Sequence, residues 1–195
     1  MDYLLDLLLG AVWFILPAYI ANSAPVDVSQ IRFLRKYGTP IDGKRTWKGM
    51  RILGDSKTWR GFYAGMLAGT LTAAIQWYVH PGLPGAYPGL PIMTIDLGFM
   101  LSLGALVGDM AASFLKRRIG MKAGASAPLM DQLDFIFGAI LFAWFWECAV
   151  SGTFSGVFEK MLGYPRFGVI ILVTPFLHII GNFLAWVWKL KKQPW

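Results

Sequence analysis

Apolar runs of about twenty residues constrain this chain more than any other feature of its sequence. A helix needs about 20 mostly apolar residues to cross a bilayer, and the chain has five such runs, at residues 3–21, 61–79, 95–115, 135–150 and 167–188. Each run should be helical, because lipid offers no hydrogen-bond partner to an open backbone. Charged residues make up only 15% of the chain, against roughly 25% in an ordinary soluble domain. The sequence therefore predicts an all-α integral membrane protein, a single domain with about five transmembrane helices.

The charges of the connecting segments predict the orientation of these helices. The segment 22–60 contains nine basic residues, Arg32, Arg35, Lys36, Lys44, Arg45, Lys48, Arg51, Lys57 and Arg60, whereas residues 80–94 contain none. The segment 116–134 begins with three basic residues in a row, and the C-terminal tail has three lysines. Basic loops stay on the cytoplasmic side, so the N-terminus is expected outside and the C-terminus in the cytoplasm. We expect a multi-pass cell-membrane protein whose active site, in the loops 22–60 and 116–134, faces the cytoplasm.

Net charge and cysteine content narrow the class of protein further. A formal net charge of +7 in a soluble protein would suggest nucleic acid, but here the basic residues flank apolar runs. Anionic lipid headgroups and phosphate substrates are therefore the expected partners, and no nucleic acid is expected. The single cysteine, Cys148, excludes a disulfide framework and a CxxC zinc site. Residues 1–6 contain two acids and no base, so we expect no cleaved signal peptide.

Asp109 is an acid inside an apolar run. A carboxylate in that position costs on the order of 3 kcal/mol on insertion scales, so it normally faces a polar cavity and has a partner. Ser113, Lys116 and Arg117 follow at offsets of four, seven and eight, which places all four side chains on one helical face. This polar stripe descends to the cytoplasmic interface. Spacing alone equally supports a structural salt bridge from Asp109 to Lys116 or Arg117.

Two further acids follow the basic cluster. If Asp131 and Asp134 begin the fourth helix, their spacing of three places them on one face. Carboxylates beside a cluster of bases suggest a divalent ion, and Mg²⁺ prefers one or two carboxylates together with water and substrate phosphate oxygens. The alternative for either acid alone is a helix cap stabilised by the helix dipole.

A short repeat lies in the first basic loop. Residues 45–49 (RTWKG) recur at 57–61 (KTWRG), and each copy offers two cations, a hydroxyl group and an indole. Such groups suit phosphate oxygens, although an interfacial segment with Trp at headgroup depth is favoured by the pattern alone. Asn22 and Ser23, at the end of the first run, would bind a nucleobase or ribose or would cap the helix.

These motifs together resemble a known family. The run Gly108-Asp109-x-x-x-Ser113-x-x-Lys116-Arg117 is followed by Lys122, Pro128 and Asp131-x-x-Asp134. With residues 17–26 and 57–61, it resembles the archaeal branch of the phosphatidate (CDP-diacylglycerol) cytidylyltransferase family, the CDP-archaeol synthases. The resemblance extends from residue 17 to about residue 138. The chain departs from the wider family at Arg60, where that family has Glu, and at Gln132, where it has Arg.

The resemblance implies a reaction and a set of site residues. The reaction joins CTP to an unsaturated archaeal ether-lipid phosphate, 2,3-bis-O-geranylgeranyl-glycerol 1-phosphate, and gives CDP-archaeol and pyrophosphate with Mg²⁺ as the cofactor. The expected metal ligands are Asp109, Asp131 and Asp134, and the expected catalytic residues are Asp109, Asp131 and Lys116. The expected contacts to substrate phosphates are Ser113, Lys116, Arg117 and Lys122, with Lys44, Arg45, Lys57 and Thr58 as further candidates. Asn22, Ser23 and Pro25 are the candidates for the cytidine end.

A small membrane transporter or channel is the alternative function. Asp109 and Glu147 would then belong to an ion pathway, because acids inside membrane spans commonly mark one. The sequence shows no self-similar halves that would support a transporter built from repeats. Release of pyrophosphate from CTP separates the two functions, since a transporter releases none. The sequence sets no oligomeric state.

Overall fold

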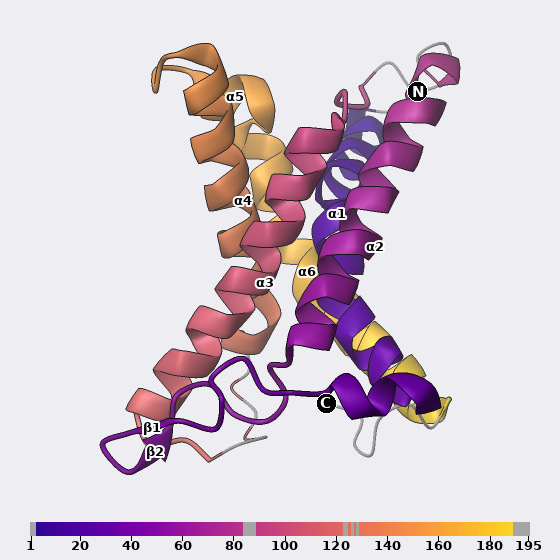
Figure 1. The fold of residues 1–195 in the computed structure, drawn as a ribbon. Coiled ribbons are helices and arrows are strands. Elements are labelled where there is room, and N and C mark those ends of the chain that lie inside the picture. The colour runs from indigo at the N-terminus through magenta and orange to yellow at the C-terminus, as the bar shows by residue number, and fades with distance from the viewer. Residues whose placement is uncertain (1–2, 84–88, 123–124, 126, 128, 189–195) are drawn as a thin grey trace.

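A computed structural model describes residues 3–83, 89–122, 125, 127 and 129–188. The expected motif residue Pro128 and the C-terminal lysines lie outside the described residues. The main helices are α1 (Tyr3–Gln30), α2 (Trp59–Val79), α3 (Ile95–Arg118), α4 (Met130–Ser151), the short α5 (Val157–Met161) and α6 (Tyr164–Val187) (Figure 1). Two 3₁₀ helices, η1 (Arg32–Tyr37) and η2 (His80–Gly82), and two strands, β1 (Thr46–Trp47) and β2 (Met50–Arg51), complete the described chain.

Four helices of the described chain are long and apolar enough to cross a membrane. They are α1, α3, α4 and residues 164–181 of α6, with mean hydropathies of 2.0, 1.5, 1.7 and 1.4, and all four were expected as spans. The fifth expected span, 61–79, lies inside α2, a helix of 21 residues that is not among the four. Small and polar residues, such as Gly65, Gly69 and Gln76, lower its hydropathy and are the buried side of this helix.

Two details of the fold predicted from the sequence are wrong. The fold is not wholly helical, because β1 and β2 pair as an antiparallel hairpin in the segment 22–60. The first helix was expected to end at residue 21, but α1 continues to Gln30 and includes Pro25. Asn22 and Ser23 therefore lie on a helix and not in a loop.

A tertiary contact explains why α1 tolerates Pro17. Pro17 has no N–H to donate to the carbonyl of Trp13 four residues earlier, and Gln76 of α2 donates its Nε2 to that carbonyl at 2.7 Å. Gln76 is only 2% exposed, so α2 supplies a buried replacement for the hydrogen bond that proline removes. Irregular helices inside membranes are stable when neighbouring helices satisfy the freed backbone groups in this way.

Glycine allows α2 to approach α1 and α3 closely. A Cβ atom added at Gly69 would lie 2.7 Å from the carbonyl oxygen of Pro17 and 2.1 Å from Oγ of Ser102. Gly61, Gly65 and Gly69 recur every four residues along this side of α2, a spacing that lets membrane helices bring their backbones together. The spacing therefore fixes α2 against its two neighbours.

The α3–α4 contact is equally close. A Cβ atom at Gly138 would lie 2.2 Å from the carbonyl oxygen of Gly104, and one at Gly108 would lie 2.4 Å from the carbonyl oxygen of Asp134. The two backbones thus touch beside Asp109. The glycines bring the acids of the two helices to the same level of the bundle.

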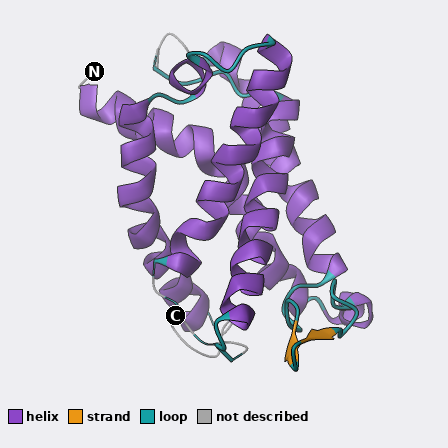
Figure 2. Ribbon diagram, turned by 90° about the vertical axis from the view of Figure 1, so that its left-hand side faces the viewer, coloured by secondary structure: helices purple, strands orange, loops and turns teal. Residues whose placement is uncertain are grey.

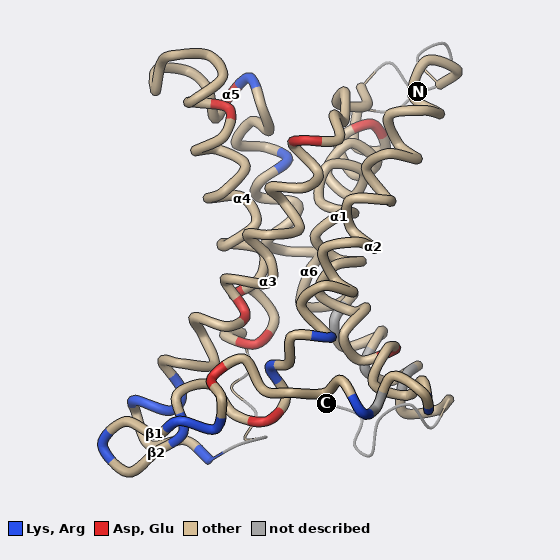
Figure 3. Tube along the Cα trace, viewed as in Figure 1, with Lys and Arg blue, Asp and Glu red and all other residues tan. Residues whose placement is uncertain are grey.

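The helices cross near the middle of the molecule and diverge toward the end that carries the hairpin. At that end α3 and the hairpin form one arm, and the last turns of α1 with the end of α6 form the other, while α2 begins between them (Figure 1). A view at right angles places the hairpin beside the ends of the helices (Figure 2). Most lysines and arginines of the described chain gather here (Figure 3). We call this end the basic end.

Candidate active site

A cavity of about 1110 Å³ lies at the basic end, with walls from α1, α2, α3, α4, α6 and the segment before α2. It brings together ten of the residues that the sequence singled out: Asn22, Ser23, Pro25, Lys57, Thr58, Asp109, Ser113, Lys116, Arg117 and Asp131. The four residues of the predicted polar stripe on α3 are all among them. These ten residues therefore line one cavity, and their roles in binding or catalysis stay predictions.

Two lysine–aspartate ion pairs connect the walls of this cavity. Lys57 donates its Nζ to Oδ2 of Asp109, and Lys116 donates its Nζ to Oδ1 of Asp131. The side chains of each pair are at most 30% exposed, so water screens the charges less than it would on an open surface. The alternative salt bridge from Asp109 to Lys116 or Arg117 does not form, because Lys57 arrives from another segment.

The other hydrogen bonds of the acidic side chains bear on which of them could hold a metal ion. Oδ2 of Asp131 accepts from the backbone N–H of Ala127 at 2.9 Å, and Oδ1 of Asp134 accepts from that of Phe135 at 2.6 Å. Asp134 itself does not line the cavity. Within the described residues, no three His, Cys, Asp or Glu side chains converge as a metal site. Asp109 and Asp131 do fit the one or two carboxylates that Mg²⁺ takes when substrate phosphates supply its other ligands.

The second copy of the repeat delivers Lys57 to the cavity. Thr58 caps α2 by accepting from the backbone N–H of Gly61 at 3.2 Å. The carbonyl of Lys57 accepts from the N–H of Ile41 at 2.8 Å, and Pro40 forms a bridge with Thr58. These contacts fix the backbone of residues 57–58, and the lysine side chain reaches Asp109 from there.

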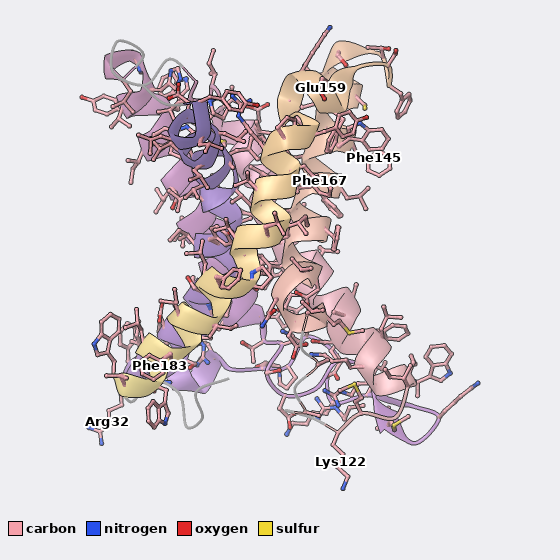
Figure 4. All side chains as sticks on the ribbon, turned by 180° about the vertical axis from the view of Figure 1, so that it is seen from behind. Arg32, Lys122, Phe145, Glu159, Phe167 and Phe183 are labelled. Carbon is pink, nitrogen blue, oxygen red and sulfur yellow. The ribbon has the colours of Figure 1, made fainter. Side chains whose placement is uncertain are left out.

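The first copy of the repeat has a different place. Its Trp47 packs under the guanidinium of Arg118, which lies 5.0 Å from the ring centroid and donates to the Trp47 carbonyl at 2.9 Å. Lys44 lines a separate surface pocket of about 600 Å³. Arg45 lines neither that pocket nor the 1110 Å³ cavity. Lys122 is exposed and points away from the molecule in Figure 4. The structure thus does not bring these three predicted phosphate contacts to the cavity.

Asp42 organises the loop that carries Lys57. Its carboxylate, fully buried at the side chain, accepts from the backbone N–H groups of Lys44, Leu53 and Gly54 at 3.0–3.1 Å. It also accepts from Arg51 at 2.8 and 3.2 Å. Burial raises the pKa of Asp42, but the hydrogen bonds from Arg51 and these backbone groups outweigh it and hold the pKa well below its usual range. The ionised carboxylate is therefore the form that the folded loop requires.

We expect Asp42→Asn to loosen this loop at neutral pH. A depressed folded-state pKa contributes stability that is present above the unfolded pKa of about 3.9 and is lost as pH falls below it. Limited proteolysis between residues 43 and 56 should therefore be at least about fivefold faster in the variant at pH 7. The difference should stay constant down to about pH 4 and should narrow only as pH falls further toward the depressed folded-state pKa. A difference that narrows already between pH 7 and pH 5 would contradict the electrostatic role of Asp42.

Several polar residues of the cavity were not singled out from the sequence. Ser29 and Gln30 belong to the unexpected last turns of α1, and Arg60 lies in the first turn of α2. Arg60 was noted as the second cation of the 57–61 repeat and as a departure from a family pattern, but it was not among the candidate site residues. Its place in the same repeat as Lys57 was the signal that could have placed it in the site.

Glu147 lies far from this cavity. The indole of the neighbouring Trp146 donates to Asp96 at 2.6 Å, so this part of α4 packs against the first turn of α3. The thirteen residues between Asp96 and Asp109 on α3 correspond to about 20 Å of helix. Asp109 and Glu147 therefore do not share a site in the described structure.

The fold and the site define an intramembrane, mainly helical enzyme with a charged cavity at one end of its bundle. The family model of the CarS-like CDP-archaeol synthases matches residues 4–195. The chain is 41% identical to a CDP-archaeol synthase of Pyrococcus horikoshii over 189 residues, 96% of this chain and 97% of that one. It is 38% identical to a CDP-archaeol synthase of Archaeoglobus fulgidus, over 98% of this chain and all of that one.

A solved structure of an intramembrane enzyme for archaeal membrane lipid biosynthesis is also similar. It matches with a TM-score of 0.63 and 31% identity, over 90% of this chain and 94% of that chain. The chain belongs to the CDP-archaeol synthase family. Its activity is that of the family, a CTP-dependent nucleotidyl transfer in archaeal membrane lipid biosynthesis.

Proposed function

We propose that this chain transfers the cytidylyl group of CTP to 2,3-bis-O-geranylgeranyl-glycerol 1-phosphate and releases pyrophosphate. The observation that carries the proposal is the composition of the cavity. Ion-paired acids and bases line its α3 and α4 walls, whereas apolar residues of α6, including Leu177, Ile179 and Leu184, line another wall. One cavity thus offers a charged surface for a triphosphate and an apolar surface for prenyl chains.

The chemistry asks the protein mainly for alignment and charge stabilisation. An oxygen of the lipid phosphate attacks the α-phosphorus of CTP, and the bond to the bridging oxygen breaks, so its electron pair leaves with pyrophosphate. The nucleophile is already anionic, and no strong general base is needed. Lys116 and Arg117 on α3 would hold the phosphates of CTP, and Ser113 would donate a hydrogen bond to one of their oxygens. Positioning and electrostatic stabilisation of this kind supply most of the catalysis in phosphate chemistry.

Asp109 and Asp131 are the residues that would hold Mg²⁺, with Asp134 as a third acid behind them. When bound there, the ion would neutralise part of the charge on the substrate phosphates. Pairing with Lys57 and Lys116 orients both carboxylates.

The membrane arrangement is part of the proposal. We place the basic end in the cytoplasm, where the positive-inside rule puts it and where CTP is dissolved. With 21 residues, α2 is about 31 Å long at 1.5 Å per residue, enough to serve as a fifth span. Single cysteines introduced at Lys48 and Phe154, in a Cys148→Ser background, should react with an impermeant thiol reagent from opposite sides. Labelling of both from one side would overturn this topology.

A product assay tests the proposed function. Purified protein with CTP, Mg²⁺ and the unsaturated ether-lipid phosphate should release pyrophosphate and CDP-lipid in equal amounts. ATP and GTP should react at least about tenfold more slowly, since a site that hydrogen-bonds one base leaves polar groups unpaired with another. Ion flux through reconstituted vesicles without pyrophosphate release would instead support the transporter.

A further inference from the structure

Arg60 is a cation of the cavity wall that the ion pairs of the site do not use. It lies in the first turn of α2 and lines the cavity. Its Nη1 donates to the backbone carbonyl of Leu34 at 2.9 Å, and its buried Nε has no hydrogen-bond partner in the described chain. Within the described residues, no carboxylate pairs with it at ion-pair distance. A guanidinium has five N–H donors, so this group retains most of its capacity to bind an anion.

The other cations of the cavity are placed differently. Lys57 and Lys116 each pair with an aspartate, and Arg117 stands on α3 beside Lys116. These groups, with Asp131 at the start of α4, belong to the charged side of the cavity. The hydrogen bond of Arg60 to Leu34 leads away from that side.

The neighbours of Arg60 belong to the arm that carries α1 and α6. Leu34, its hydrogen-bond partner, lies in η1 directly after α1. The adjacent Gly61 packs on α1, where an added Cβ would lie 3.0 Å from Cβ of Pro25. In Figure 4, Arg32 of η1 and Phe183 of α6 lie on one arm, and Lys122 lies on the other side of the basic end. Arg60 thus lies at the base of the arm formed by α1 and α6, and α6 supplies the apolar wall of the cavity.

We propose that Arg60 binds the phosphate of the lipid substrate, so that separate cations hold the two reacting anions. The inference rests on the proposed function, because it needs an anionic lipid and a triphosphate in one cavity. Arginine binds a phosphate through two parallel N–H donors, and this geometry orients the phosphate as well as attracting it. The prenyl chains of a lipid held there extend along the α1 and α6 wall, while CTP occupies the α3 and α4 wall. Two subsites of this kind place two mutually repelling anions next to each other in a fixed orientation.

Steady-state kinetics with each substrate varied separately tests this assignment. The variants are Arg60→Gln, which removes the charge, and Arg60→Lys, which keeps the charge without the planar pair of donors. Arg32→Gln is the matched control, because Arg32 is an exposed cation of the same arm that does not line the cavity. The wild-type protein must form CDP-lipid in the same assay, so a failure of the proposed function is recognised independently of the variants.

The expected result is a change in KM for one substrate only. In Arg60→Gln, KM for the lipid phosphate should rise at least about tenfold, the loss typical of one charge-assisted hydrogen bond, while KM for CTP stays within about twofold. Arg60→Lys should give a rise of about three- to fivefold, and Arg32→Gln should match wild type. Dodecyl phosphate, as a competitor of the lipid, should lose inhibitory strength in parallel.

Three outcomes would overturn the assignment. The first is an unchanged KM for the lipid phosphate in either Arg60 variant. The second is an equal rise in KM for CTP, which would place Arg60 in the nucleotide subsite. The third is unchanged inhibition by dodecyl phosphate together with a lowered melting temperature, since a purely structural hydrogen bond to Leu34 predicts that pattern. If Arg60→Gln does not fold, Arg60→Lys decides between the first outcome and the proposal.

Discussion

Replacing Asp109 with Asn is expected to lower kcat for CDP-lipid formation by about a thousandfold or more while the protein still folds and inserts. The substitution keeps the shape of the side chain but removes the charge that pairs with Lys57 and that would hold Mg²⁺. Losing one preorganised electrostatic contact at a reacting phosphate or carbonyl typically lowers kcat by about 10²–10³-fold, and here two such contacts depend on one carboxylate. Initial rates at saturating CTP and lipid phosphate measure the effect, and calorimetry should show weaker Mg²⁺-dependent binding of CTP.

Asp55 provides the matched control. It also lines the cavity, and Asp55→Asn removes the same charge, but its side chain is 78% exposed and pairs at 2.6 Å with Arg51, which also pairs with Asp42. The rate of Asp55→Asn should stay within about threefold of wild type. A rate of Asp109→Asn close to that of Asp55→Asn would remove Asp109 from the catalytic machinery.

The second large effect is expected at a residue that contacts no substrate, Gly138. In Gly138→Ala the new methyl group would meet the carbonyl oxygen of Gly104 at 2.2 Å and Cα of Gly108 at 2.8 Å. Both are backbone atoms that cannot rotate away, so α3 and α4 must separate. Overpacking of this kind costs about 3 kcal/mol, and a misplacement of about 1 Å at a reacting centre lowers rates about 10²-fold. We therefore expect a lower melting temperature together with a loss of activity of about that size.

Gly168→Ala is the control for this substitution. Gly168 lies on α6, and an added Cβ would meet nothing within 4 Å. The melting temperature and rate of this variant should equal or slightly exceed those of wild type, because Ala favours helix by about 1 kcal/mol over Gly. Wild-type activity in Gly138→Ala would mean that the spacing of α3 and α4 does not position the acids.

The sequence predicted the parts of this site that lie on one helix. A period of 3.6 residues was enough to place Asp109, Ser113, Lys116 and Arg117 on a common face, and all four line the cavity. It could not predict the ion pair between Lys57 and Asp109, because these residues are 52 positions apart. Helical periodicity carries no information on which loop folds back over which helix.

The end of α1 shows a second limit of prediction from the sequence. The apolar run ends near residue 21, and so residues 22–30 were expected in a loop. The helix nevertheless continues through Pro25 to Gln30. At Pro17 the neighbouring helix supplies the missing partner, because Gln76 of α2 donates to the carbonyl of Trp13, and hydropathy carries no information on such tertiary contacts. The repeat in the first basic loop shows the same dependence on context. Two nearly identical segments form a hairpin turn in one case and a helix start in the other.

The two ion pairs of the cavity have a consequence for substrate binding. Asp109 of α3 pairs with Lys57 of the segment before α2, and Lys116 of α3 pairs with Asp131 of α4. An anion bound by either lysine competes with the aspartate that the lysine already holds. Substrate binding and the two ion pairs are therefore thermodynamically linked, and whatever strengthens the pairs in the empty site lowers the affinity for anionic substrates.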